Sequence, residues 1–99
     1  MCGRMQVGNK LGRLRGQIDA LDRRIVRMLN ARGRLAMRMV EHKQARPARI
    51  PARERQVLAH VAALGRGPIS PTRLRAIYKA IMRACLAVQV EAWRYRSGG

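Results

Sequence analysis

The stretch LGRLRGQIDALDRRIVRMLNARGRLAMRMVEHKQ, residues 11–44, decides the fold of this chain of 99 residues. It contains no proline, and its apolar residues recur at the three- and four-residue spacing of an α-helix. The pattern therefore predicts one long helix from Leu11 to about Gln44. The apolar residues are Ile18, Ile25, Leu29, Ala36 and Met39 in one seam, and Leu14, Leu21, Met28 and Leu35 in a neighbouring row.

The length of this helix indicates a homodimer. At ~1.5 Å per residue it is roughly 50 Å long, which exceeds the width of a compact monomer of this size. The helix therefore cannot bury its whole seam against its own chain. A second copy of the chain is the simplest cover for the remainder.

Prolines and glycines divide the rest of the chain. Pro47 and Pro51 predict a loop over residues 45–51. A second helix is expected at about 52–64, before the Gly-Arg-Gly-Pro sequence that begins at Gly65.

A third helix follows this second break. Ser70 is a favourable N-cap, and Pro71 suits the first helical position. We expect this helix to run to about Trp93 or Tyr95.

The composition fits a single all-α domain of one long and two shorter helices. Aromatic residues make up only 3% of the chain and Phe is absent. The core must therefore be aliphatic, which favours helices over a sheet. We expect a flexible N-terminus over residues 1–10, a helical domain over residues 11–95 and a flexible tail over residues 96–99.

The charge of the chain points to an anionic partner. The formal net charge is +17, with 19 arginines and three lysines against five acidic residues. Such a field attracts nucleic acid, an acidic membrane or a small polyanionic metabolite. Nucleic acid is disfavoured because the basic residues are spread over all three expected helices, without helix-turn-helix spacing or a set of stacking aromatics. A basic helical nucleic-acid-binding protein is the non-enzymatic alternative.

Further patterns limit the compartment and the chemistry. No apolar run suits a membrane span or a signal peptide, so we expect no membrane partner. Cys2 and Cys85 do not form a disulfide framework, which fits a reducing compartment. We therefore expect a cytoplasmic protein. Because His42 and His60 are isolated and no metal-ligand cluster is visible, we expect neither a metal nor a cofactor.

Charged residues interrupt the apolar face of the long helix. Arg15, Asp22, Arg32 and Lys43 share its stripe, and helical geometry places them on the covered side. Buried cations need a partner, and Asp22 can balance at most one of the three. A small anion bound between helices is the preferred explanation. Alternatively, the long basic side chains reach past the seam to water, or a polar seam residue sets the register of a coiled coil.

Gln89 is a candidate on the third helix. It lies beside Cys85 and Val88, close to the apolar row. Its amide is a neutral hydrogen-bond donor that would share a pocket with Arg32 and Lys43. The alternative is a boundary glutamine that faces water or a backbone group.

These positions also carry a family resemblance. The segment LRGQIDALDRRIVRMLNARGRLA, residues 14–36, resembles the opening helix of the all-helical, AroQ-type chorismate mutases. Lys43 lies eleven residues after Arg32, as in that family. The resemblance covers roughly residues 11–92. Its other motifs are RERQVL at residues 53–58, GPIS at residues 67–70 and IMRACLAVQ at residues 81–89.

The resemblance implies an intertwined helical homodimer with two active sites, each built from both chains and each binding a small dianionic substrate. Arg32 and Lys43 would bind this substrate from one chain, and Arg15 would reach in from the other.

The resemblance also assigns roles on the two shorter helices. Glu54 would accept a hydrogen bond from the ring hydroxyl of the substrate. Gln89 would donate to its ether oxygen, as would Lys43. Cys85 would lie near a carboxylate, and Arg53 is a candidate on the loop side.

Some features resemble a related enzyme instead. The loop before Arg53 is short, and Ile50 stands where mutases often have an acidic residue. IPARER at residues 50–55 and the Gln-x-x-x-Trp-Arg ending at residues 89–94 resemble isochorismate-pyruvate lyases of siderophore pathways. Three features favour a chorismate mutase, namely the GPIS link, the Arg-Glu pair at residues 53–54 and Cys85. The lyase is the alternative.

Overall fold

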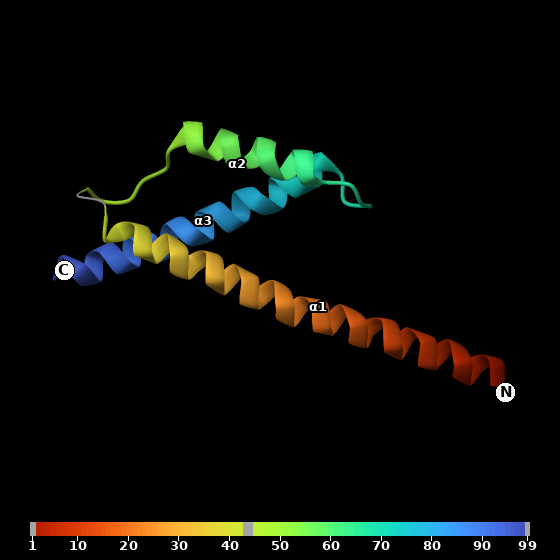
Figure 1. Cartoon of the computed structure of the whole chain (residues 1–99). Coiled ribbons are helices and arrows are strands. Elements are labelled where there is room, and N and C mark those ends of the chain that lie inside the picture. Colours follow the sequence, from red (N-terminus) through yellow and green to blue (C-terminus); the bar gives the residue numbers. More distant parts are fainter. Residues whose placement is uncertain (1, 43–44, 99) are drawn as a thin grey trace. The chain divides into compact units, whose positions relative to one another are not determined.

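Three helices make up the computed structural model, which describes the backbone of residues 2–42 and 45–98 and the side chains of residues 9–42 and 45–98. They are α1 (Cys2–Val40), α2 (Pro51–Leu64) and α3 (Pro71–Arg96), and the described residues contain no strand (Figure 1). The prediction of an all-α fold with one long and two shorter helices is confirmed.

The boundaries of α1 differ from the expected ones. The helix begins at Cys2, nine residues before Leu11. Each glycine near the start costs a helix about 1 kcal/mol relative to alanine, but extending an existing helix adds one hydrogen bond per residue. At the other end α1 stops at Val40, short of Gln44. The next residues tighten into a turn, in which His42 N donates to the Met39 carbonyl at 3.0 Å.

The chain divides into two compact units, residues 1–31 and residues 32–99, and α1 contributes to both. The first unit is helical from Cys2 onward. A lone helix has no surface against which to bury an apolar seam, so the large apolar side chains of this unit are exposed within the single chain. These side chains are Leu11, Leu14, Ile18, Leu21, Ile25, Val26, Met28 and Leu29.

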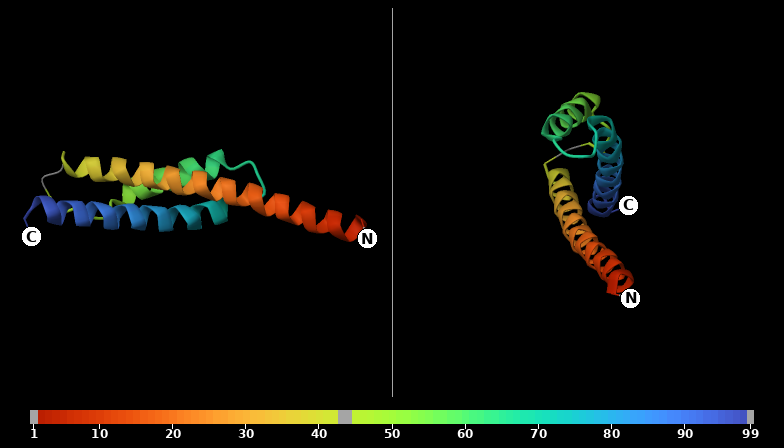
Figure 2. Two further views of the ribbon diagram at one scale, coloured as in Figure 1. Left: turned by 90° about the horizontal axis from the view of Figure 1, so that it is seen from below. Right: turned by 90° about the vertical axis from the view of Figure 1, so that its right-hand side faces the viewer.

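The second unit contains the last turns of α1 together with α2 and α3. Helices α2 and α3 pack on each other and are joined by residues 65–70 (Figure 1). The end of α1 runs beside α3 in both views of Figure 2. The buried hydrophobic core residues are Ala36, Val40, Val61 and Cys85, and Pro47 of the loop before α2 is also buried. Because these side chains are small or medium in size, the core of the unit is thin.

The helix ends of the second unit follow the signals in the sequence. Pro51 occupies the start of α2, and the backbone N–H of Gly65 closes that helix on the Ala62 carbonyl at 3.3 Å. Ser70 caps α3, because its Oγ accepts a hydrogen bond from Arg73 N at 3.2 Å. These predictions of Gly65 and Ser70 as terminal residues are confirmed. None of the described helices has the length and hydropathy needed to cross a membrane.

The cap of α3 gives a first testable prediction. Ser70→Ala removes the acceptor of the Arg73 N–H and should lower the free energy of unfolding by about 1 kcal/mol, measured by urea denaturation. Ser97→Ala is the matched control, because Ser97 closes α3 through its backbone N–H to the Trp93 carbonyl. Equal losses in the two variants would contradict the role of the Ser70 side chain.

Candidate active site

A cavity of about 300 Å³ lies within the second unit. Its walls come from the end of α1, the loop before α2, the first half of α2 and the middle of α3. Six side chains provide polar groups, and the others provide an apolar lining. The polar lining residues are Arg32, Arg49, Arg53, Glu54, Cys85 and Gln89, and the apolar ones are Leu35, Ala36, Met39, Ala48, Ile50, Val57, Met82 and Leu86.

Arg32 brings a positive charge to the cavity from α1. Its side chain is partly buried, and Nη1 donates a hydrogen bond to Cys85 Sγ on α3 at 3.1 Å. Cys85 itself is buried, with a free thiol. A guanidinium group has five N–H donors, so this contact fixes Arg32 while leaving other donors for an anion.

Gln89 lies on the same face of α3, one helical turn after Cys85. It is only 9% exposed, and Nε2 donates a hydrogen bond to the Ala36 carbonyl at 3.0 Å. Ala36 is also buried. The amide of Gln89 carries two N–H donors, so one donor remains after this contact.

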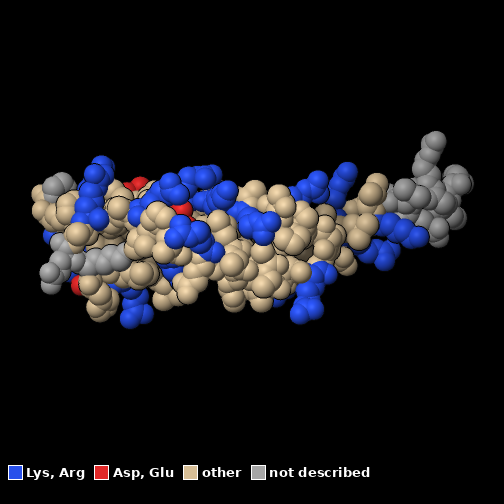
Figure 3. Space-filling model, turned by 90° about the horizontal axis from the view of Figure 1, so that it is seen from above, with Lys and Arg blue, Asp and Glu red and all other residues tan. Residues whose placement is uncertain are grey.

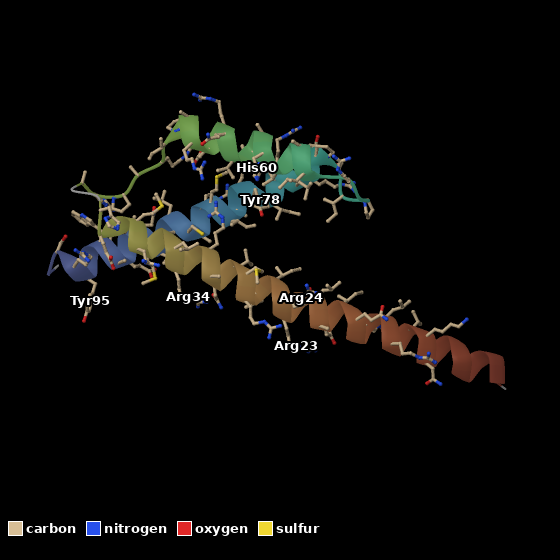
Figure 4. The ribbon with its side chains drawn as sticks, viewed as in Figure 1. Arg23, Arg24, Arg34, His60, Tyr78 and Tyr95 are labelled. Carbon is tan, nitrogen blue, oxygen red and sulfur yellow. The ribbon has the colours of Figure 1, made fainter. Side chains whose placement is uncertain are left out.

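Arg53 is placed by the first turn of α2. Its side chain is exposed, and Nη1 donates to Gln56 Oε1 at 2.6 Å, within the same helix. Arg53 and Arg32 also line a neighbouring hollow, which includes His60 of α2 and Tyr78 of α3 (Figure 4).

Glu54 is the acidic group of the cavity, and Arg49 holds it. Arg49 Nη2 donates to Glu54 Oε1 at 2.6 Å, and Arg49 Nε donates to Glu54 Oε2 at 3.0 Å. These hydrogen bonds lower the pKa of the Glu54 carboxyl. Partial desolvation opposes the decrease, and the positive charges of Arg49, Arg83 and Lys79 add to it.

The cavity lies in a strongly positive field. Within residues 9–42 and 45–98, the pair of Arg49 and Glu54 is the sole ion pair. Arg32 and Arg53 thus have no carboxylate partner among the described side chains. On the face of the molecule drawn in Figure 3, Lys and Arg side chains far outweigh acidic ones. This field favours the entry of an anion.

The structure brings together five of the seven residues predicted for the site, namely Arg32, Arg53, Glu54, Cys85 and Gln89. Lys43 lies outside the described residues. Arg15 is exposed and belongs to the first unit, whereas every residue that lines the cavity belongs to the second.

Arg49 is the polar residue that the sequence analysis missed. It lies in the loop, five positions before Glu54, so no helical spacing connects the two residues. A weak signal existed, because Pro51 fixes the start of α2 and thereby places Glu54 in its first turn, close to the preceding loop. The apolar lining was also missed, since side chains on four segments contribute to it.

The arrangement suits a small, largely apolar molecule with carboxylate groups. Two arginines without carboxylate partners can each bind a carboxylate. A buried amide and an ionised glutamate then provide one donor and one acceptor. No group of three or more His, Cys, Asp or Glu residues in the described part of the chain could hold a metal ion.

Comparison with known proteins gives a match over most of the chain. The family described as chorismate mutase type II matches residues 14–90. That range includes both hydrogen bonds between α1 and α3 and every residue that lines the cavity.

The curated relatives are longer proteins. A bifunctional chorismate mutase/prephenate dehydratase of Stutzerimonas stutzeri is 32% identical over 92 residues, which cover 86% of this chain and 25% of that protein. The protein of the same description from Aquifex aeolicus (strain VF5) is 35% identical over 86 residues, with 81% and 24% covered. The one from Neisseria gonorrhoeae is 33% identical over 75 residues, with 76% and 21% covered. The chain thus spans about a quarter of the length of these relatives.

Proposed function

Because this chain belongs to the chorismate mutase type II family, we propose that it catalyses the rearrangement of chorismate to prephenate, a step of aromatic amino acid biosynthesis. One observation carries the proposal. Five residues that the family resemblance assigns to substrate meet around one cavity, and they come from three different helices.

The reaction is pericyclic, so it needs no nucleophile, no general base and no metal. A C–O bond breaks while a C–C bond forms, and negative charge builds on the ether oxygen in the transition state. Fixed donors aimed at this oxygen lower the barrier, because they are already oriented when the charge develops. The active site therefore acts through orientation and electrostatics.

Arg32 supplies the main electrostatic contact in this proposal. Its planar guanidinium group can hold a carboxylate through two parallel hydrogen bonds. The contact with Cys85 Sγ limits its rotation. Holding the substrate carboxylates also selects the folded conformer in which the two reacting carbons are close together.

Gln89 and Glu54 act on neutral parts of the substrate. The second N–H of Gln89 donates to the ether oxygen, while the first keeps the side chain on the Ala36 carbonyl. Glu54 accepts a hydrogen bond from the ring hydroxyl. Apolar side chains such as Val57 and Leu86 then contact the faces of the ring.

Two further contacts complete the proposed site. Lys43 donates to the ether oxygen together with Gln89, and Arg15 binds substrate from a second copy of the chain. The exposed apolar seam of the first unit supports a homodimer, since a single chain leaves these side chains in water. The proposed enzyme is a cytoplasmic homodimer.

The direct test is an assay of the purified protein on chorismate. Prephenate should form without an added metal or cofactor. In a parallel reaction with isochorismate, salicylate and pyruvate should not be the main products. If the protein converts isochorismate and leaves chorismate unchanged, the mutase proposal is wrong.

Arg32 tests the assignment of the site. Arg32→Ala should lower kcat/KM for chorismate by about 10³-fold, the scale expected when one partner of a desolvated, hydrogen-bonded charge pair is removed. Arg34→Ala is a matched control, because Arg34 is exposed and projects from α1 away from α2 (Figure 4). Near-normal turnover by a folded Arg32→Ala variant would remove Arg32 from the mechanism.

Gln89 gives a prediction about pH. In Gln89→Glu the new carboxyl group is buried, which raises its pKa, and it can donate to the ether oxygen only when protonated. The kcat/KM of this variant should therefore increase as the pH falls, and activity should be lost as the pH rises through that pKa. The pH profile of Gln17→Glu, which alters an exposed glutamine of α1, should match the wild type. A profile for Gln89→Glu identical to the wild type would place Gln89 outside the reaction.

The homodimer is tested by mass and by a change in the seam. Light scattering should give twice the 11.2 kDa of one chain. Ile25→Asp places a charge on the seam and should yield a monomer with little activity. Val26→Asp is the control, because Val26 is equally exposed in the single chain but lies about 100° around the helix. A fully active monomeric wild type would refute the shared site.

A further inference from the structure

The ion pair of the cavity joins Glu54 to Arg49, a residue to which the family resemblance assigns no role. Arg49 meets Glu54 in a two-pronged ion pair, with separations of 2.6 and 3.0 Å. Both side chains line the cavity. The pair therefore fixes the direction of the acceptor that faces the proposed ring hydroxyl.

The backbone that carries Arg49 is itself well constrained. Pro47 is buried, and Pro51 begins α2. Ile50, between Arg49 and Pro51, is extended with φ −120° and ψ 95°, the conformation that a following proline favours. Arg49 thus projects from a short segment with few accessible conformations.

Stability does not explain this pair. The Arg49 side chain is 67% exposed, and water screens ion pairs at such positions. Its geometry has another consequence, because each carboxylate oxygen of Glu54 accepts one hydrogen bond from Arg49 and keeps a second acceptor direction. Glu54 can therefore bind a hydroxyl group while Arg49 holds it.

We propose that Arg49 is a positioning residue that holds the Glu54 carboxylate in the wall of the cavity, oriented to accept the hydroxyl of the substrate. This inference rests on the proposed function. Arg49 acts through Glu54, so its loss should weaken binding of the hydroxyl in substrate and transition state alike. The loss of an interaction that is equally strong in substrate and transition state raises KM and leaves kcat nearly unchanged.

The surroundings of Glu54 allow its ionisation to be followed. The positive groups that act on it are Arg49 in the loop and Lys79 and Arg83 on α3. Arg32 of α1 and Arg53 of α2 line the same cavity. Among these groups, Arg49 has the largest effect on the pKa of Glu54, through its hydrogen bonds. Removal of Arg49 should therefore raise that pKa toward the ordinary value for glutamate.

An NMR titration measures this effect without any activity. The chain has only three glutamates, Glu41, Glu54 and Glu91, so ¹³C-labelled carboxyl groups can be assigned by substitution. In Arg49→Gln the titration midpoint of Glu54 should move upward. An unchanged Glu54 midpoint would overturn the proposal.

Kinetics on chorismate supply the second measurement. Arg49→Gln should raise KM about 10-fold, the scale of one lost hydrogen bond to a charged group, with a smaller change in kcat. The acidic limb of kcat/KM should move to higher pH, because activity that needs the ionised Glu54 is lost as the pH falls through its pKa. Arg49→Lys should recover only part of the effect, since an ammonium group lacks the planar fork.

Arg46→Gln is the matched control. Arg46 is exposed, lies in the same loop and is absent from the cavity lining, yet its loss changes the net charge equally. It should leave the Glu54 midpoint and KM unchanged. Equal shifts in the two variants would reduce the effect to general electrostatics and overturn the proposal. The two proposals can fail separately. If the Glu54 midpoint moves upward in Arg49→Gln but the wild type does not rearrange chorismate, the role of the ion pair is supported and the proposed function is wrong.

Discussion

Two hydrogen bonds between α1 and α3 define the cavity on which the rest of the structure depends. Arg32 reaches Cys85, and Gln89 reaches the Ala36 carbonyl, each across 53 positions of the chain. Arg32 and Ala36 are one turn apart on α1, as are Cys85 and Gln89 on α3. The two hydrogen bonds therefore connect the helices at positions one helical turn apart. They hold a cation and an amide at fixed points, which electrostatic catalysis requires.

The positive charge of Arg32 is the second constraint on the structure. A half-buried guanidinium group without a carboxylate partner is unfavourable, and Arg32 has none among the described side chains. An anionic ligand would offset this unfavourable free energy. A carboxylate of the chain itself would also offset it, but it would block the position at which a ligand binds. The net charge of +17 extends the same preference over the surface. The proposed dianionic substrate would thus be attracted from a distance.

The ion pair of Arg49 and Glu54 shows how the loop keeps the other arginines of the cavity free for an anion. A carboxylate near several arginines would be free to pair with any of them and to neutralise the site. Arg49 holds it through both oxygens, while Arg32 makes its own contact with Cys85. The short, proline-bounded loop makes this separation possible, because it limits the positions that Arg49 can reach.

The sequence by itself determined the helices, since helical periodicity and end signals are local. The seam from Ile18 to Met39 indicated the long helix, and Ser70 with Pro71 located the start of α3. The prediction of the start of α1 was wrong, because it counted only the free-energy cost of glycine in a helix. Helix propagation adds a hydrogen bond for each residue, and α1 therefore extends to Cys2 despite its glycines. Arg32 and Gln89 were recognised as candidates because a polar group on an apolar face needs a partner. Only the tertiary structure decided which partners they have, because a contact between residues 53 positions apart depends on how the helices pack. It also decided the role of Arg49, whose contact with Glu54 joins a loop to a helix and follows no periodic spacing.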